Sequence, residues 1–174
     1  MKTCVSLVTC LGLFLAIGCT QETSKTSSSS SSAASVDGST YLLNKEPDGA
    51  EDVIKVREAA QDGDDVLIVG RIGGPKPWTD GRAEFLIVDN SRKACSDIEG
   101  DNCKTPWDYC CDSDNLTTAM ALVKVVDENG DLVKADARQL LKVKELSTVI
   151  VKGKAKRDDA GNLIVLATGV YVKK

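Results

Sequence analysis

The sequence predicts a mainly β domain: a five-stranded, OB-like antiparallel barrel with one helix between strands 3 and 4 and an extra N-terminal helix. Three observations support this prediction. Apolar residues recur with the two-residue period of strands in most of the segments after residue 65. A segment with helical spacing separates the third of these strands from the fourth. Glycines lie inside or near strands, where a small barrel needs tight bends, at Gly70, Gly153 and Gly169.

The first predicted element is a helix over residues 48–61. Pro47 precedes the segment, Asp48 can cap it, and Gly63 ends it. Its apolar positions recur at helical spacing, and they are Val53, Val56 and Ala60. We expect this helix to cover one end of the barrel.

The strands follow, each bounded by turn residues. They are predicted at residues 66–72, 83–89, 118–127, 148–155 and 162–172, with polar turns at residues 127–130 and 158–161. Residues 136–143 are predicted helical, with an apolar stripe of Ala137, Leu140 and Leu141. The order is strand, strand, strand, helix, strand, strand, which is the topology of the OB-fold. Another small antiparallel barrel or sandwich with a helical cap is the alternative.

The N-terminus has the pattern of a signal peptide over residues 1–19. Lys2 supplies a positive start, and an apolar run too short to span a bilayer comfortably follows it. The run ends in Ala16-Ile17-Gly18-Cys19, which resembles the lipobox of bacterial lipoproteins, in which the cysteine is lipidated, for example with palmitate, and becomes the new N-terminus. We therefore expect a lipid on Cys19, the alternative being a plain secretory signal.

Residues 20–40 are rich in Ser, Thr and Ala, with six consecutive serines at 27–32. Such a stretch has little to bury, so we expect a disordered tether between the lipid anchor and a domain at 41–174. Thr20 follows the lipidated cysteine, where lipoproteins retained at the inner membrane often carry Asp. This favours a cell-envelope location at the outer membrane over the inner.

The connection between the second and third strands, residues 90–116, is far longer than a normal hairpin loop. It holds all four cysteines of the predicted domain: Cys95, Cys103, Cys110 and Cys111. In an exported protein an even cysteine number favours disulfides. A bridge between the adjacent pair would be strained, so Cys95 and Cys103 would each pair with one of them.

Two other interpretations of these cysteines remain open. Four thiolates can hold zinc, but the gaps of seven, six and no residues differ from the usual spacing, and adjacent cysteines rarely reach one ion. A reducible Cys110–Cys111 bridge could act as a redox switch, although no CxxC motif and no His is near it. We assign no metal and no cofactor to the chain.

Aromatic residues accompany the cysteines. Trp107 and Tyr109 lie in the loop, and Trp78 lies in the first hairpin loop, where we expect it to be exposed. These three are the predicted contacts to a ligand or partner. The alternative for Trp107 is that it packs the loop onto the barrel.

Three strings carry a resemblance: Gly70-Arg71-Ile72-Gly73-Gly74, Thr105-Pro106-Trp107-Asp108-Tyr109-Cys110-Cys111 and Val151-Lys152-Gly153-Lys154-Ala155. They resemble a set of exported OB-fold-like lipoproteins of planctomycete-type bacteria. The resemblance runs from about Pro47 to the C-terminus. It implies the fold and an exported location, and it transfers no catalytic residue.

Composition narrows the function. The chain has 22 Lys plus Arg against 26 Asp plus Glu and no His, which excludes a strongly basic nucleic-acid binder and every His-dependent mechanism. Nucleic acid is a disfavoured partner, because single-strand binders combine a basic groove with stacking aromatics. We therefore predict a non-enzymatic binding or structural module that contacts the membrane through its lipid and an unknown envelope ligand or protein. Metal binding or redox sensing through the cysteine loop is the alternative.

Overall fold

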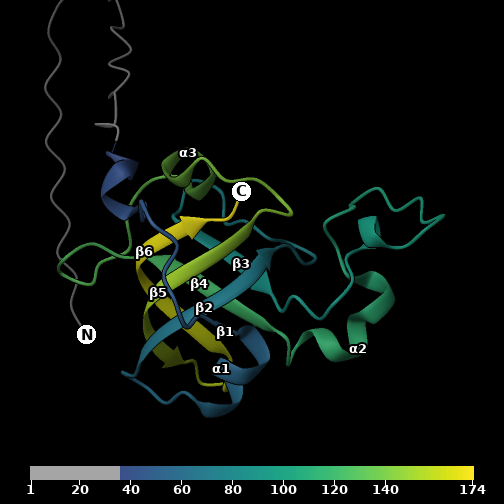
Figure 1. Cartoon of the computed structure of the whole chain (residues 1–174), viewed down its shortest axis with the longest axis horizontal. Coiled ribbons are helices and arrows are strands. Elements are labelled where there is room, and N and C mark those ends of the chain that lie inside the picture. The colour runs from purple at the N-terminus through teal and green to yellow at the C-terminus, as the bar shows by residue number, and fades with distance from the viewer. Residues whose placement is uncertain (1–35) are drawn as a thin grey trace, which may run out of the picture. The chain divides into compact units, whose positions relative to one another are not determined.

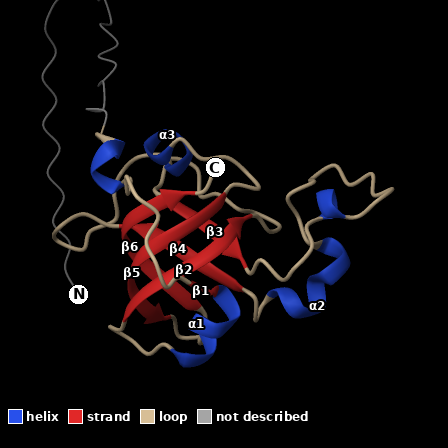
Figure 2. Cartoon of the chain, in the orientation of Figure 1, coloured by secondary structure: helices blue, strands red, loops and turns tan. Residues whose placement is uncertain are grey.

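The computed structural model describes residues 36–174, and its centre is a closed barrel (Figures 1 and 2). The strands that form it are β2 (Asp65–Ile72), β3 (Glu84–Val88), β4 (Met120–Val125), β5 (Thr148–Arg157) and β6 (Leu163–Val172). They are hydrogen-bonded in the order β2-β3-β4-β6-β5, and β5 closes the barrel on β2. The β4–β6 pairing is parallel, and the other barrel pairings are antiparallel. With α3 (Ala137–Leu141) between β4 and β5, the predicted OB-like fold is confirmed.

The core fills the barrel because inward positions alternate along each strand. In β4 the inward residues are Ala121, Val123 and Val125, while Met120, Leu122 and Lys124 face outward and are half-buried. The helix α3 adds Ala137, Leu140 and Leu141 to the same core, as its apolar stripe predicts.

Gly153 allows the backbone of β5 to lie unusually close to the backbone of β6. A Cβ at this position would lie 2.2 Å from the carbonyl oxygen of Leu166, closer than any side chain tolerates. The register between β5 and β6 also shifts here, since Lys152 faces Gly169 and Gly153 faces Ala167, so that Thr168 is the extra residue of a bulge. Glycine is therefore required at the point where the sequence predicts a bend.

The N-terminal helix α1 (Val53–Ala59) is shorter than predicted. Residues 51 and 52 instead form β1 (Glu51–Asp52), which pairs in parallel with β2. The first turn of α1 is not capped by Asp48: the Asp89 carboxylate, at the end of β3, accepts from the Ile54 N–H at 2.8 Å. Val53 and Val56 are buried in the barrel core, so the helix covers the barrel as expected.

The ordered domain begins earlier than residue 41. Residues 38–40, predicted as part of the tether, belong to the 3₁₀ turn η1 (Gly38–Tyr41), and the Leu43 N–H then donates to the Val170 carbonyl at 2.9 Å. The predicted signal peptide, Cys19 and most of the tether lie outside the described residues. Within residues 36–174 no helix is long and apolar enough to cross a bilayer.

Candidate functional site

The long loop after β3 projects from the barrel and carries short helical turns: η2 (Cys95–Asp97), η3 (Cys110–Asp112) and α2 (Ser113–Leu116) (Figure 1). Its base is attached to β2 and to the residues that follow β2. The Arg71 guanidinium pairs with the Asp97 carboxylate at 2.6 Å, and the Gly74 N–H donates to the Trp107 carbonyl at 3.0 Å. Arg71 holds the pKa of Asp97 below its usual range. The loop therefore has one defined position on the barrel.

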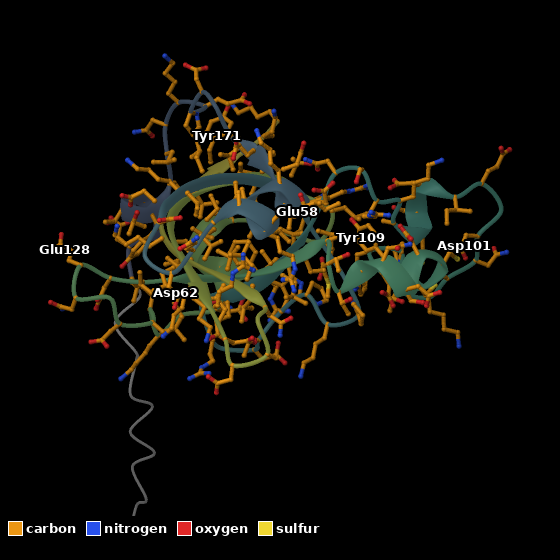
Figure 3. All side chains as sticks on the ribbon, turned by 90° about the horizontal axis from the view of Figure 1, so that it is seen from below. Glu58, Asp62, Asp101, Tyr109, Glu128 and Tyr171 are labelled. Carbon is orange, nitrogen blue, oxygen red and sulfur yellow. The ribbon has the colours of Figure 1, made fainter. Side chains whose placement is uncertain are left out.

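Tyr109 packs the loop onto the barrel. Its side chain is 1% exposed and lies in a small cluster with Val88, Ala94 and Leu116. Figure 3 shows it at the junction of barrel and loop, with Asp101 far out in the loop. A Cβ on Gly73 would lie 2.7 Å from the Trp107 carbonyl oxygen and 2.9 Å from the Tyr109 ring, so glycine is needed opposite it.

Burial has a chemical consequence for Tyr109. Its hydroxyl has no hydrogen-bond partner among the described residues. Burial raises the pKa of this phenol to about 12. The ring cannot offer a surface to a ligand, so its predicted contact role does not fit its position. Trp107 is only half-buried, and its backbone carbonyl makes the contact to the barrel.

Trp78 is also buried, and the prediction that it is exposed is wrong. It is 8% exposed, its ring lies 6.1 Å from that of Phe85, and its indole N–H donates to the Glu145 carboxylate at 2.6 Å. The Arg138 guanidinium lies 5.6 Å from the ring centroid. Its hairpin loop folds back over the barrel, where Trp78 forms an antiparallel bridge with Phe85, so the aromatic ring is enclosed.

Three of the four loop cysteines converge. The Sγ atoms of Cys95, Cys103 and Cys110 all lie within 4.8 Å of one another, and those of Cys95 and Cys110 are 3.2 Å apart. Cys111 Sγ is 4.0 Å from Cys110 Sγ and lies outside this group of three. No S–S bond joins cysteines within residues 36–174, so the predicted disulfides stay a prediction. We refer to Cys95, Cys103 and Cys110 as the thiol cluster.

The thiols of the cluster differ in environment. Cys95 is 2% exposed, and burial raises the pKa of its thiol to about 12. Cys103 is half-buried, and its contact with the Thr105 hydroxyl, at 3.3 Å, lowers the pKa of its thiol. The cluster therefore extends from the loop interior to solvent, which makes its outer sulfurs accessible.

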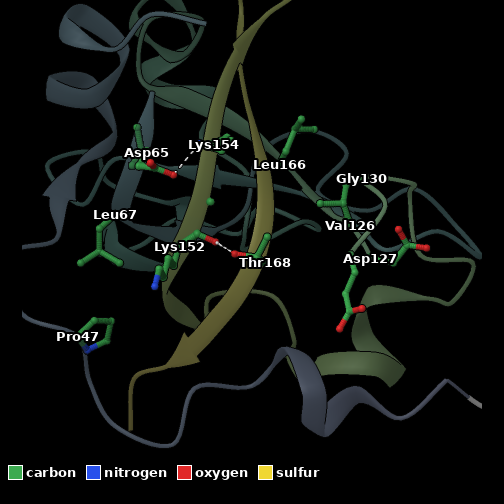
Figure 4. Close-up of a pocket in the computed structure, with 13 residues that line it drawn as sticks. Pro47, Asp65, Leu67, Val126, Asp127, Gly130, Lys152, Lys154, Leu166 and Thr168 are labelled. Atoms are coloured by element: carbon green, nitrogen blue, oxygen red, sulfur yellow. Dashed lines mark hydrogen bonds and ion pairs between the residues drawn. The ribbon is translucent and has the colours of Figure 1, made fainter. Parts of the chain in front are cut away.

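A second feature is a groove on the outer surface of β2, β5 and β6, bounded by the turn after β4 (Figure 4). Its volume is about 650 Å³. Aliphatic residues line it, and they are Val66, Leu67, Val126 and Leu166, with Pro47 at one end. Its charged residues are Lys152, Lys154, Asp65, Asp127 and Glu128, of which Lys154 and Asp65 form an ion pair at 3.0 Å. We refer to this surface as the strand-face groove.

The sequence prediction missed this groove. A signal was present, because Val66-Leu67-Ile68-Val69 and Leu163-Ile164-Val165-Leu166 are unbroken apolar runs. A barrel strand with water outside should alternate apolar and polar residues, so an unbroken run places apolar side chains on the outer face as well.

No protein-family model and no curated protein matches the chain. Among solved structures, it is similar to the mitochondrial single-stranded DNA binding protein Rim1 of S. cerevisiae, with a TM-score of 0.37 and 18% identity over 66% of this chain and 98% of that one. At this level of similarity, no ligand or residue role is transferred to the present chain.

Proposed function

We propose that this chain is a non-catalytic binding module held at the cell envelope by a lipid on Cys19, and that the strand-face groove takes an extended peptide segment. The groove carries this proposal. Binding sites in proteins are concave and mostly apolar, with a few polar groups that orient the ligand. The strand-face groove has that composition.

The lining of the groove favours a peptide over a nucleic acid or a sugar. Bases and sugar rings are usually bound by stacking on aromatic side chains, whereas the lining here is aliphatic. Lysines and carboxylates are both present at the groove, so its charge suits a ligand that carries both signs. Apolar peptide side chains would lie on Leu67 and Leu166, and the charged residues would set their orientation.

Two carboxylates, Asp136 and Asp158, have hydrogen bonds that are structural, and this supports a non-catalytic role for them. Asp136 caps α3 and pairs with Arg138, which holds the pKa of its carboxyl at about 2. The Asp158 carboxylate accepts from the backbone of the hairpin turn at Ala160 and Asn162. A carboxylate held in this way has little freedom to exchange protons with a substrate.

The peptide proposal is tested with two matched variants. Leu67→Asp places a charge in the groove, while Leu86→Asp places one on β3, at a half-buried outward position away from the groove. Random displayed peptides are selected on the wild-type chain, and the affinity of one enriched peptide is measured for all three proteins. We expect Leu67→Asp to weaken binding by about 10–100-fold, since a buried leucine contributes about 1.5–3 kcal/mol, and Leu86→Asp to leave it unchanged. Failure to enrich any peptide, or equal effects of both variants, would contradict the proposal.

Envelope anchoring is tested separately. Cys19→Ala removes the sulfur that would carry the lipid, so we expect the protein to move from the detergent-extractable membrane fraction to the soluble one. If it stays with the membrane, the lipid-anchor proposal is wrong while the peptide proposal stands on its own measurement.

A further inference from the structure

The thiol cluster is assembled from three separate parts of the loop. Cys95 comes from η2, Cys110 from η3, and Cys103 from the connection between them. Two backbone hydrogen bonds align the first and last parts: the Cys95 N–H donates to the Asp108 carbonyl at 2.7 Å, and the Ser96 N–H donates to the Pro106 carbonyl at 2.9 Å. The Asp101 carboxylate accepts from the Cys103 N–H at 2.9 Å and so orients the third. Hydrogen bonds in the loop therefore position all three cysteines.

The spacing of the three sulfurs suits a metal ion. In a tetrahedral zinc site the Zn–S bonds are about 2.3 Å, so the sulfurs stand about 3.8 Å apart. In the thiol cluster, Cys95 Sγ and Cys110 Sγ are 3.2 Å apart and no two sulfurs are more than 4.8 Å apart, so the spacing is already close to that of a zinc site. Small movements of the two outer side chains would bring all three sulfurs to one ion. A disulfide, by contrast, joins only two sulfurs, about 2.05 Å apart, and a Cys95–Cys110 bridge would leave Cys103 to pair with Cys111, which lies outside the cluster.

The structure also answers the objection raised by the sequence spacing. Adjacent cysteines rarely bind one ion together, but only Cys110 of the adjacent pair belongs to the cluster. Three protein ligands leave a fourth position for solvent or an exchangeable ligand. The loop has more carboxylates than basic residues, and within residues 36–174 Glu99, Asp101 and Asp114 form no ion pair, which favours a cation over an anion.

We propose that Cys95, Cys103 and Cys110 bind one thiophilic divalent cation, for which Zn²⁺ is the test ion. Each thiol loses its proton as its sulfur–metal bond forms, and no electron is transferred. Cys111 is not a ligand. The site lies in the loop, on residues that the strand-face groove does not use, so metal binding is independent of peptide binding.

The test uses the full chain, purified with a phosphine reductant and transferred to reductant-free, oxygen-free buffer. Zinc affinity is measured by competition with a chromophoric chelator, and bound metal is counted by mass spectrometry. Alkylation followed by peptide mapping then identifies which thiols zinc protects, and this separates the loop cysteines from Cys4, Cys10 and Cys19. We expect one zinc ion per chain and protection of Cys95, Cys103 and Cys110.

Two serine variants sharpen the test. Cys103→Ser removes a ligand that is only half-buried, so the variant should still fold. Loss of a residue that merely hydrogen-bonds to a metal ligand lowers metal affinity by up to about 100-fold. We therefore expect loss of the ligand itself to lower zinc affinity by more than about 100-fold. Cys111→Ser is the matched control, which should keep wild-type affinity. Circular dichroism checks that both variants are folded.

Three outcomes would overturn the proposal. The first is a reduced, folded chain that retains no zinc. The second is a Cys111→Ser variant that loses as much affinity as Cys103→Ser, since the ligand set would then be different. The third is protein isolated from the envelope with Cys95 and Cys110 joined in a bridged peptide and no metal present, which would establish the structural disulfide instead.

Discussion

The barrel strands are joined by continuous runs of backbone hydrogen bonds over alternating aliphatic side chains, whereas the loop of residues 90–116 is attached to the barrel by a few individual contacts. Those contacts include the Arg71–Asp97 pair, the Gly74–Trp107 hydrogen bond and the buried Tyr109 ring with its neighbours Ala94 and Leu116. The barrel is stabilised by many similar interactions, so most single substitutions there should lower the free energy of unfolding only moderately. In the loop each contact is different, so its loss should loosen the loop without unfolding the barrel.

The largest expected effect breaks the barrel itself. Gly153→Ala places a Cβ 2.2 Å from the Leu166 carbonyl, and neither backbone can move without opening the β5–β6 ladder. We expect the free energy of unfolding to fall by about 3 kcal/mol or more, measured by denaturant titration. Gly130→Ala is the control: the Cβ added there would meet no atom within 4 Å, and the φ of Gly130 is +84°, so only the left-handed backbone strain of about 1 kcal/mol applies. Equal losses of unfolding free energy in the two variants would show that the close approach of β5 to Leu166 does not require glycine at position 153.

The second expected effect is a loss of stability at alkaline pH that originates in the loop, at Tyr109, and not in the barrel. The pKa of Tyr109 is about 12 in the folded protein against about 10 when unfolded, so the folded state keeps a proton that the unfolded state loses. The contribution of Tyr109 to the free energy of unfolding is therefore fully present below about pH 10. About 2–3 kcal/mol of that free energy is lost as pH rises to 12.

Tyr109→Phe should remove this alkaline loss and should cost little at neutral pH, because the hydroxyl has no partner among the described residues. The measurement is urea unfolding at several pH values, with the half-buried Tyr171→Phe as the control. Parallel profiles of unfolding free energy against pH for wild type and Tyr109→Phe would show that the Tyr109 hydroxyl does not cause the alkaline loss of stability.

The third effect opens the junction. Gly73→Ala pushes a methyl group against the Trp107 carbonyl and the Tyr109 ring, so we expect about 2 kcal/mol of destabilisation confined to the loop. Hydrogen exchange should quicken at residues 94–112 and stay slow in β4, β5 and β6. In the control Gly100→Ala, the new Cβ has no atom within 4 Å, so this variant carries only the left-handed strain of about 1 kcal/mol that a φ of +80° imposes. Faster exchange throughout the barrel would mean that loop and barrel unfold as one unit.

The smallest effect concerns a single charge. Asp97→Asn keeps the shape of the side chain but removes its ion pair with Arg71, a partly exposed interaction worth about 1 kcal/mol. Because Arg71 lowers the pKa of Asp97, this contribution is present above the ordinary Asp pKa of about 3.9 and is lost as pH falls through the lower folded value. Loop exchange rates at pH 7 and in high salt measure it. No change on substitution would mean that the pair does not hold the loop.

The same contrast explains what the sequence could predict. Strand periods, turn residues and the bend at Gly153 are local patterns, and they were enough for the barrel and for the position of α3. The groups that place the loop are distant in sequence: Arg71 pairs with Asp97, and Gly73 lies against Tyr109. No local pattern links these residues. Trp78 was misplaced for the same reason, because its partner Glu145 is supplied by the connection between α3 and β5.

The convergence of three cysteines likewise depends on the path of the loop. The spacing of Cys95, Cys103 and Cys110 along the chain does not reveal that two backbone hydrogen bonds bring the first beside the last. The outward leucines of the strand-face groove could have been identified from the unbroken apolar runs in β2 and β6.

The pairing of β1 with β2 affects the tendency of this protein to aggregate at high local concentration. Exposed strand edges are where separate molecules join into aggregates. The barrel closes on itself, and the flank of β2 between residues 68 and 69 is covered by β1. In the described part of the chain, β1 adds only a two-residue edge of exposed, acidic Glu51 and Asp52, where like charges repel. This edge therefore gives neighbouring copies of the domain little backbone on which to extend a sheet.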